Sequence, residues 1–90
     1  MGDIKIEKPN KEELERSGVF SWPIWEKEVS NFDWHYDQTE VCYLLEGEVV
    51  VKTEDAQEVK FAAGDLVTFP KGLSCKWDIK KAVRKHYNFK

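Results

Sequence analysis

From Trp22 to the end of the chain, apolar and polar residues alternate with a period of two, and turn-forming residues interrupt the alternation at regular intervals. A period of two places every second side chain on the same face of a β-strand, so each run predicts a half-buried strand. Seven or more short strands with no long helix between them predict an all-β fold, either an antiparallel sandwich or a barrel. The predicted strands cover residues 32–36, 41–45, 49–53, 58–61, 66–69, 74–79 and 83–89, and the predicted turns lie at Glu46-Gly47, Glu54-Asp55, Ala63-Gly64-Asp65 and Pro70-Lys71-Gly72.

Two short elements precede these strands. The alternation of residues 4–7 predicts a short strand. Asn10 can cap the N-terminus of a short helix, and Glu13 three residues later completes a capping box. Because no repeat, linker or low-complexity segment interrupts the chain, we expect residues 1–90 to form a single domain whose core barrel covers about residues 20–90.

The composition argues against nucleic-acid binding and membrane association. The 90 residues carry 17 acidic and 14 basic side chains, a net charge of -3, which argues against a broadly basic nucleic-acid-binding protein. Apolar stretches are far shorter than the roughly 20 residues that span a bilayer, and no apolar signal segment is present, so we expect a cytoplasmic protein without membrane association. Cys42 and Cys75 lack CxxC spacing, which favours free thiols in a reducing compartment.

Charge is distributed unevenly along the chain. Residues 71–90 contain seven basic side chains and one acidic side chain, Asp78, whereas residues 1–70 contain 7 basic and 16 acidic ones. We interpret the basic run as a solvated face of the last strands. The alternative is that it steers an anion or a complementary protein surface toward the molecule.

Glycine, proline and glutamate recur at specific spacings. Six residues separate Glu40 from Gly47, and five residues separate Gly64 from the segment Pro70-Lys71-Gly72, with Cys75 following after two more. The glycines of the second set supply tight-turn conformations, and the proline fixes the start of the second turn. These spacings resemble the two motifs of cupins, which are small β-barrels of the jelly-roll type.

The resemblance extends over about residues 20–90. Segments 22–26 and 64–72 strengthen it, and the chain is similar to the short stand-alone cupins grouped with the ethanolamine-utilisation cupin and the ureidoglycine aminohydrolase cupin. The resemblance implies an all-β cupin jelly-roll β-barrel with a short N-terminal strand and helix.

The metal-binding positions implied by the resemblance are mostly changed. Cupin metal sites commonly use two or three His and one Glu, a donor set that suits manganese, iron, zinc or nickel. Glu40 is retained, but Cys75 stands where the second motif has its His. Two registers exist for the first motif, and only one of them puts Asp33 and His35 at the two His positions. In that register a divalent Zn, Mn, Fe or Ni ion could be held by His35, Glu40 and Cys75; otherwise no cofactor is predicted.

Strand alternation favours the other register. It places Phe32, Trp34 and Tyr36 on one face, where large rings suit a barrel interior, and leaves His35 facing water. The metal site is then degenerate, and Glu40 is a candidate catalytic acid or base beside a ligand pocket. The predicted pocket residues are Trp34, Tyr36, Glu40, Cys75 and Trp77.

Each candidate also has a purely structural interpretation. Glu40 can pair with a neighbouring Lys or Tyr hydroxyl instead of binding a ligand, and both interpretations stay open. Cys42 and Cys75 can be inert packing residues, because a buried free cysteine mostly behaves as a small apolar side chain.

Three functions follow from these alternatives. The preferred one is a small-molecule-binding cupin with a degenerate metal site. The second, implied by the family grouping, is a metal-dependent enzyme of the aminohydrolase or isomerase type that acts on a small polar substrate. The third is a structural homodimer, because a chain of this length buries only about 60 to 65% of its unfolded surface and residues 4–25 have enough apolar side chains to reach a partner. The sequence leaves open whether the protein is an enzyme.

Overall fold

The described residues form seven strands of one antiparallel sheet, in which the runs predicted at 74–79 and 83–89 are parts of one long strand. The computed structural model describes residues 4–89, and the strand order is β1-β6-β4-β7-β2, with β3 paired to β7 and β5 paired to β4. The predicted all-β fold with a short N-terminal strand and helix is confirmed. The strands are β1 (Lys5–Glu7), β2 (Ile24–Lys27), β3 (Ser30–His35), β4 (Glu40–Thr53), β5 (Glu58–Ala62), β6 (Leu66–Phe69) and β7 (Ser74–Phe89); the helix α1 (Lys11–Arg16) and a 3-10 turn η1 (Val19–Ser21) lie between β1 and β2.

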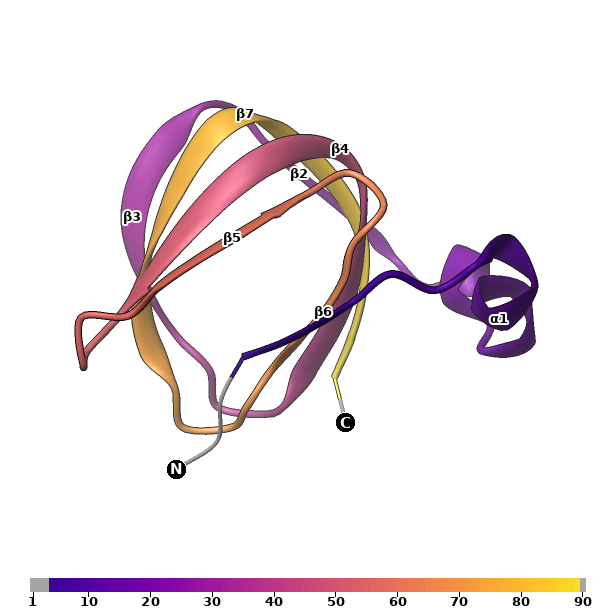
Figure 1. The fold of residues 1–90 in the computed structure, drawn as a ribbon, viewed down its shortest axis with the longest axis horizontal. Helices are drawn as coiled ribbons and strands as arrows, with labels where there is room; N and C mark the ends of the chain where they lie inside the picture. Colours follow the sequence, from indigo (N-terminus) through magenta and orange to yellow (C-terminus); the bar gives the residue numbers. More distant parts are fainter. Residues whose placement is uncertain (1–3, 90) are drawn as a thin grey trace.

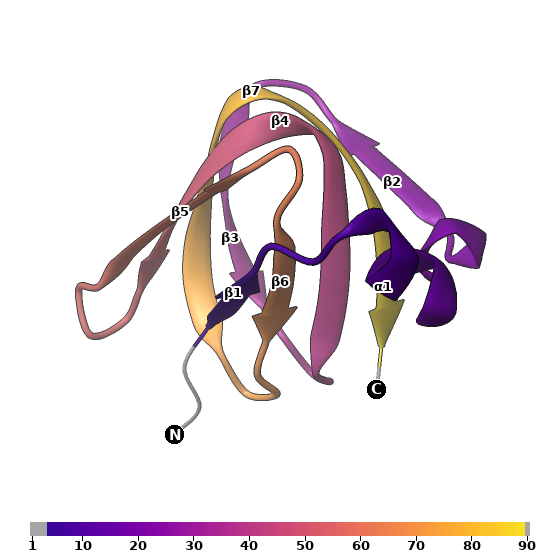
Figure 2. The same ribbon diagram turned by 45° about the vertical axis from the view of Figure 1, so that its right-hand side comes forward.

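The sheet curls around a common interior (Figure 1). Figure 2 shows the same curvature from a second direction, with α1 outside the sheet and to one side of it. Within residues 4–89 the end strands β1 and β2 do not pair with each other, so the sheet is open. The predicted jelly-roll architecture therefore takes the form of a strongly curved sheet without a closing pair of strands.

β4 and β7 are the two central strands and cross the whole sheet. They pair with each other from Glu40 opposite Phe89 to Thr53 opposite Cys75. On its other side β4 pairs with β6 and then with β5, whereas β7 pairs with β2 and then with β3. Along most of its length, each central strand turns one face toward the interior of the curved sheet.

A β-bulge at Gly47 replaces one predicted turn. The sequence predicted that Glu46-Gly47 separates two strands, and this prediction is wrong, because β4 continues through both residues. The register with β7 shifts on either side of Glu48. Gly47 has a φ of 114°, and a Cβ atom there would lie 2.8 Å from the carbonyl oxygen of Ala82. Glycine thus lets the strand bend sharply without losing its partner.

Inward-facing side chains form one apolar cluster. Leu44, Val51 and Phe69 are completely buried. Burial of a side chain of this size contributes about 1.5 to 3 kcal/mol. Aromatic rings fill the centre, where Phe69 stacks on Tyr36 with 4.7 Å between the ring centroids.

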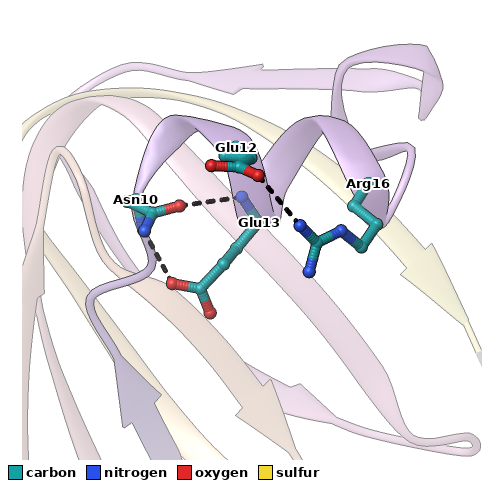
Figure 3. A network of polar contacts seen from close by, with 4 residues as sticks. All are labelled: Asn10, Glu12, Glu13 and Arg16. Atoms are coloured by element: carbon teal, nitrogen blue, oxygen red, sulfur yellow. Dashed lines mark hydrogen bonds and ion pairs between the residues drawn. The ribbon is translucent and has the colours of Figure 1, made fainter.

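The N-terminal segment adds strand β1 to the sheet and places the helix α1 beside it (Figure 2). Asn10 accepts a hydrogen bond from the backbone N–H of Glu13 at 2.8 Å, and the Glu13 carboxylate accepts one from the backbone N–H of Asn10, so the predicted capping box is confirmed (Figure 3). Arg16 and Glu12 form an additional ion pair one turn apart. Because β1 pairs with β6 of the same chain, this segment completes its own sheet.

In the described residues, neither α1 nor any other helix is long and apolar enough to cross a membrane.

Candidate functional site

A cavity of about 210 Å³ opens on the inner face of the curved sheet. Its wall consists almost wholly of aromatic rings, and two charged side chains, Glu40 from β4 and Lys85 from β7, face it. An apolar cavity with a few convergent polar groups is the usual form of a small-molecule site. The lining residues are Trp25, Phe32, Trp34, Tyr36, Glu40, Trp77, Lys85, Tyr87 and Phe89.

Glu40 and Lys85 form a buried ion pair. Lys85 Nζ donates a hydrogen bond to Glu40 Oε2 at 2.7 Å, and the two side chains keep only 5% and 7% of their surface exposed. Two buried charges lose most of their hydration, so each depends strongly on its partner. The pairing of Glu40 with a lysine was one of the two interpretations that the sequence left open.

Two indole rings hold the ammonium group of Lys85. Its Nζ lies 4.9 Å from the ring centroid of Trp25 and 4.8 Å from that of Trp77. A cation over an indole face is attracted by the ring quadrupole, and this attraction strengthens where water is excluded. The carboxylate and the two rings therefore fix the position of the amine inside the cavity.

Tyr36 contributes a hydroxyl group to the same wall. Trp77 Nε1 donates a hydrogen bond to Tyr36 Oη at 3.1 Å. Burial raises the pKa of Tyr36, and the nearby Glu40 carboxylate raises it further. Tyr36 is thus a neutral phenol that can donate a hydrogen bond into the cavity.

The structure brings together four of the five predicted pocket residues. Tyr36, Glu40 and Trp77 are buried at the cavity, and Trp34, which is 47% exposed, forms its rim. Cys75 does not line this cavity. It is buried under a separate, wider groove, where burial raises the pKa of its thiol to about 11.

His35 lies away from Glu40. Its side chain is exposed beside the same groove as Cys75, with Nδ1 2.7 Å from Ser74 Oγ and Nε2 3.6 Å from Asp37 Oδ1. The pleat of β3 explains this placement, since it turns the rings of Phe32 and Trp34 to the inner face and the intervening side chains outward.

The candidate metal set is not assembled. Among residues 4–89, no group of three or more His, Cys, Asp or Glu side chains lies close enough to hold a metal ion, and His35, Glu40 and Cys75 are not brought together. Cys42 interacts with the Glu40 carboxylate, and burial raises the pKa of its thiol to about 12. With the Lys85 ammonium already on the carboxylate, these residues do not fit a divalent ion.

The pocket predicted from the sequence lacks five of the residues that line the cavity, and Lys85 and Trp25 are the two that bear on its chemistry. The other three are Phe32, Tyr87 and Phe89. We had interpreted Lys85 as part of a solvated basic run, and this is wrong for that residue. The signal that could have found it is strand alternation, because Lys85 shares its parity with Val83 and Tyr87, two apolar residues. Trp25 lies directly opposite Lys85 in the pairing of β2 with β7.

The curved sheet, the two glycine-containing motifs and a site on the inner face define a small cupin. More closely, the chain belongs to the EutQ-like cupin domain family, whose model matches residues 14–87. The expected resemblance is confirmed.

Two solved structures show how far this similarity reaches. A DUF861 family protein from Thermotoga maritima is 58% identical, with a TM-score of 0.96, and the match covers 98% of this chain and 100% of that one. A putative ethanolamine utilization protein Q from Salmonella typhimurium is 29% identical, with a TM-score of 0.66, and the match covers 73% of this chain but only 53% of that one. A comparison with curated proteins finds no match.

Proposed function

We propose that this cupin binds a small, mostly apolar organic molecule in the cavity above Glu40 and Lys85. The observation that carries the proposal is a buried ion pair facing a space of about 210 Å³ between aromatic rings. This volume lies below the roughly 300 to 1,000 Å³ of typical ligand pockets, so the ligand is about the size of a single ring with a short substituent.

A gain in stability does not explain why this ion pair is buried. Replacing a buried pair by well-packed apolar residues is often neutral or stabilising. A pair at the wall of a cavity is better explained by recognition, since it presents a strong donor and a strong acceptor side by side.

The charges define the polar end of the ligand. The pair is neutral as a unit, so a ligand without net charge disturbs it least. Lys85 can donate to a carbonyl or hydroxyl oxygen, and Glu40 can accept from a hydroxyl or amide N–H. The rings of Trp25, Phe32 and Trp77 then stack against the apolar part of the ligand.

Tryptophan fluorescence tests the proposal, because Trp25, Trp34 and Trp77 line the cavity. The probes are benzamide, benzoate and benzylamine, which share a ring and differ in charge. We expect saturable quenching that is strongest for benzamide. Glu40→Gln should weaken benzamide binding by at least about tenfold, as for a lost hydrogen bond to a charged group.

Glu48→Gln is the matched control. Glu48 belongs to the same strand, but it is exposed and pairs with Lys81. This variant should bind like the wild type. Quenching that no probe saturates, or an equal loss in both variants, would count against the proposed pocket.

A further inference from the structure

Lys85 is chemically distinct from the other lysines of the molecule. It is the one buried lysine among residues 4–89, and its amine faces the cavity rather than solvent. Its Nζ lies 2.7 Å from Glu40 Oε2, close enough for direct proton transfer. A buried lysine beside an acid–base group in an apolar pocket is the arrangement that carbonyl-capturing lysines use.

We propose that Lys85 forms a reversible imine with a small aromatic aldehyde bound in this cavity. The inference rests on the proposed function and deepens it by naming the ligand class and the atom that reacts. The ring of the aldehyde lies among the aromatic residues of the wall, and its carbonyl carbon meets Lys85 Nζ.

Glu40 supplies the proton transfers. It first takes one proton from the ammonium group, and the free amine adds to the carbonyl carbon to form a C–N bond. A proton then moves from nitrogen to the former carbonyl oxygen, which gives a carbinolamine. Glu40 returns its proton to the hydroxyl group, the C–O bond breaks, and water leaves. The sum is ammonium plus aldehyde giving iminium plus water, and no other reactant is needed.

The cavity favours this product for two reasons. Imine formation releases water, and a wall of rings that excludes water opposes the reverse hydrolysis. The iminium also keeps the positive charge of the ammonium group. It can therefore retain the contacts with Glu40, Trp25 and Trp77 that hold the amine in the ligand-free protein.

Reductive trapping provides the test. The wild-type protein is incubated with benzaldehyde and sodium cyanoborohydride, which reduces the iminium to a stable N-benzyl-lysine, and the modified lysine is located by peptide mass mapping. We expect Lys85 to be modified at least about tenfold faster than the exposed Lys80, because its amine is positioned beside a bound carbonyl. Equal or slower modification of Lys85 overturns the proposal, since burial alone predicts protection.

Two variants sharpen the assignment. Lys85→Arg keeps the positive charge but has no nucleophilic amine, and it should lose the fast modification. Lys80→Arg is the matched control and should leave it unchanged. If Lys85→Arg fails to fold, the peptide map of the wild type still tests the proposal, because Lys80 is an internal reference within the same molecule.

Benzyl alcohol separates this inference from the proposed function. It has the same ring but no carbonyl group. Saturable fluorescence quenching by benzyl alcohol without preferential labelling of Lys85 would overturn the imine and leave the binding pocket standing. If neither quenching nor preferential labelling occurs, the binding pocket and the imine are both overturned.

Discussion

At the scale of single residues, the cavity depends on one ion pair. Glu40 and Lys85 come from the two central strands, and both side chains are almost fully buried. Each side chain therefore needs the other to avoid an unpaired buried charge, but the pair as a whole adds little to the free energy of unfolding.

Removal of either partner should be strongly destabilising. We expect Glu40→Leu or Lys85→Met alone to lower the free energy of unfolding by about 3 to 5 kcal/mol, because each leaves an unpaired buried charge. The double variant should recover most of this loss. Urea denaturation of the two single variants and the double variant measures the coupling; strictly additive losses would show that the two side chains do not interact.

The two thiols make stability sensitive to alkaline pH. Burial raises the pKa of Cys42 to about 12 and that of Cys75 to about 11, from an ordinary value of 9.0. Below pH 9 both thiols are protonated in the folded and unfolded states, and the stability that arises from their raised pKa values is fully present. Above it the unfolded state loses protons first, so the free energy of unfolding falls as the pH rises from about 9 to about 12.

Urea denaturation in a reducing buffer between pH 8 and about 10 measures this fall. Cys42→Ala and Cys75→Ala should each make the fall less steep by a similar amount, because in this pH range only the thiols of the unfolded state lose their protons. An unchanged slope in the variant that lacks both thiols would contradict the assignment.

The site could be predicted only in part, for a reason that is visible at Lys85. Alternation in residues 32–36 was enough to place Trp34 and Tyr36 on the face that lines the cavity, because that run is unbroken. Lys85 lies after the irregular stretch of β7 opposite Gly47, and it is flanked by other basic residues. Its burial depends on Glu40 and Trp25, which are distant in sequence. The local charge pattern therefore predicted an exposed side chain where the structure has a buried one.

At the scale of elements, bulges rather than turns shape β4 and β7. Glu46-Gly47 is compatible with either, because glycine serves a tight turn and a bulge through the same positive φ. The choice is made by β7, which continues alongside β4 on both sides of Gly47. The number of short strands was therefore overestimated in this region, while the turns at Gly64 and Gly72 were placed correctly.

Gly47→Ala should be more damaging than Gly64→Ala. Both glycines have a positive φ, so alanine costs about 1 to 2 kcal/mol at either position. At Gly47 the added Cβ also meets backbone atoms of Ala82 and Val83, whereas nothing lies within 4 Å at Gly64. Thermal unfolding of the two variants compares them; equal losses would indicate that the bulge relaxes around a methyl group.

At the scale of the whole molecule, the open sheet leaves the edge of β2 available for pairing with a second copy. β2 pairs with β7 alone among the described strands, and Phe20 and Ile24 expose large apolar surfaces beside this edge. Sheet edges of this kind are common sites of association. We accordingly propose a homodimer formed through β2, in which residues 4–7 stay in their own sheet.

The mass in solution tests the dimer. Light scattering should give twice the mass of the 90-residue chain, and Ile24→Lys should give the monomer mass because it places a charge in the interface. Val29→Lys is the control, since Val29 is exposed in the connection between β2 and β3. A wild-type mass that equals a single chain at micromolar concentration would exclude this assembly.

The position of β7 between β4 on one side and both β2 and β3 on the other has a consequence for hydrogen exchange. Residues 74–79 lie between β4 and β3, and residues 83–86 lie between β4 and β2, so deuterium can enter most of these amides only when the sheet as a whole separates. The three-residue strand β1 is held by β6 alone and can open locally. Exchange rates should thus divide the molecule into a slow centre that carries Lys85 and a fast margin at the N-terminal strand.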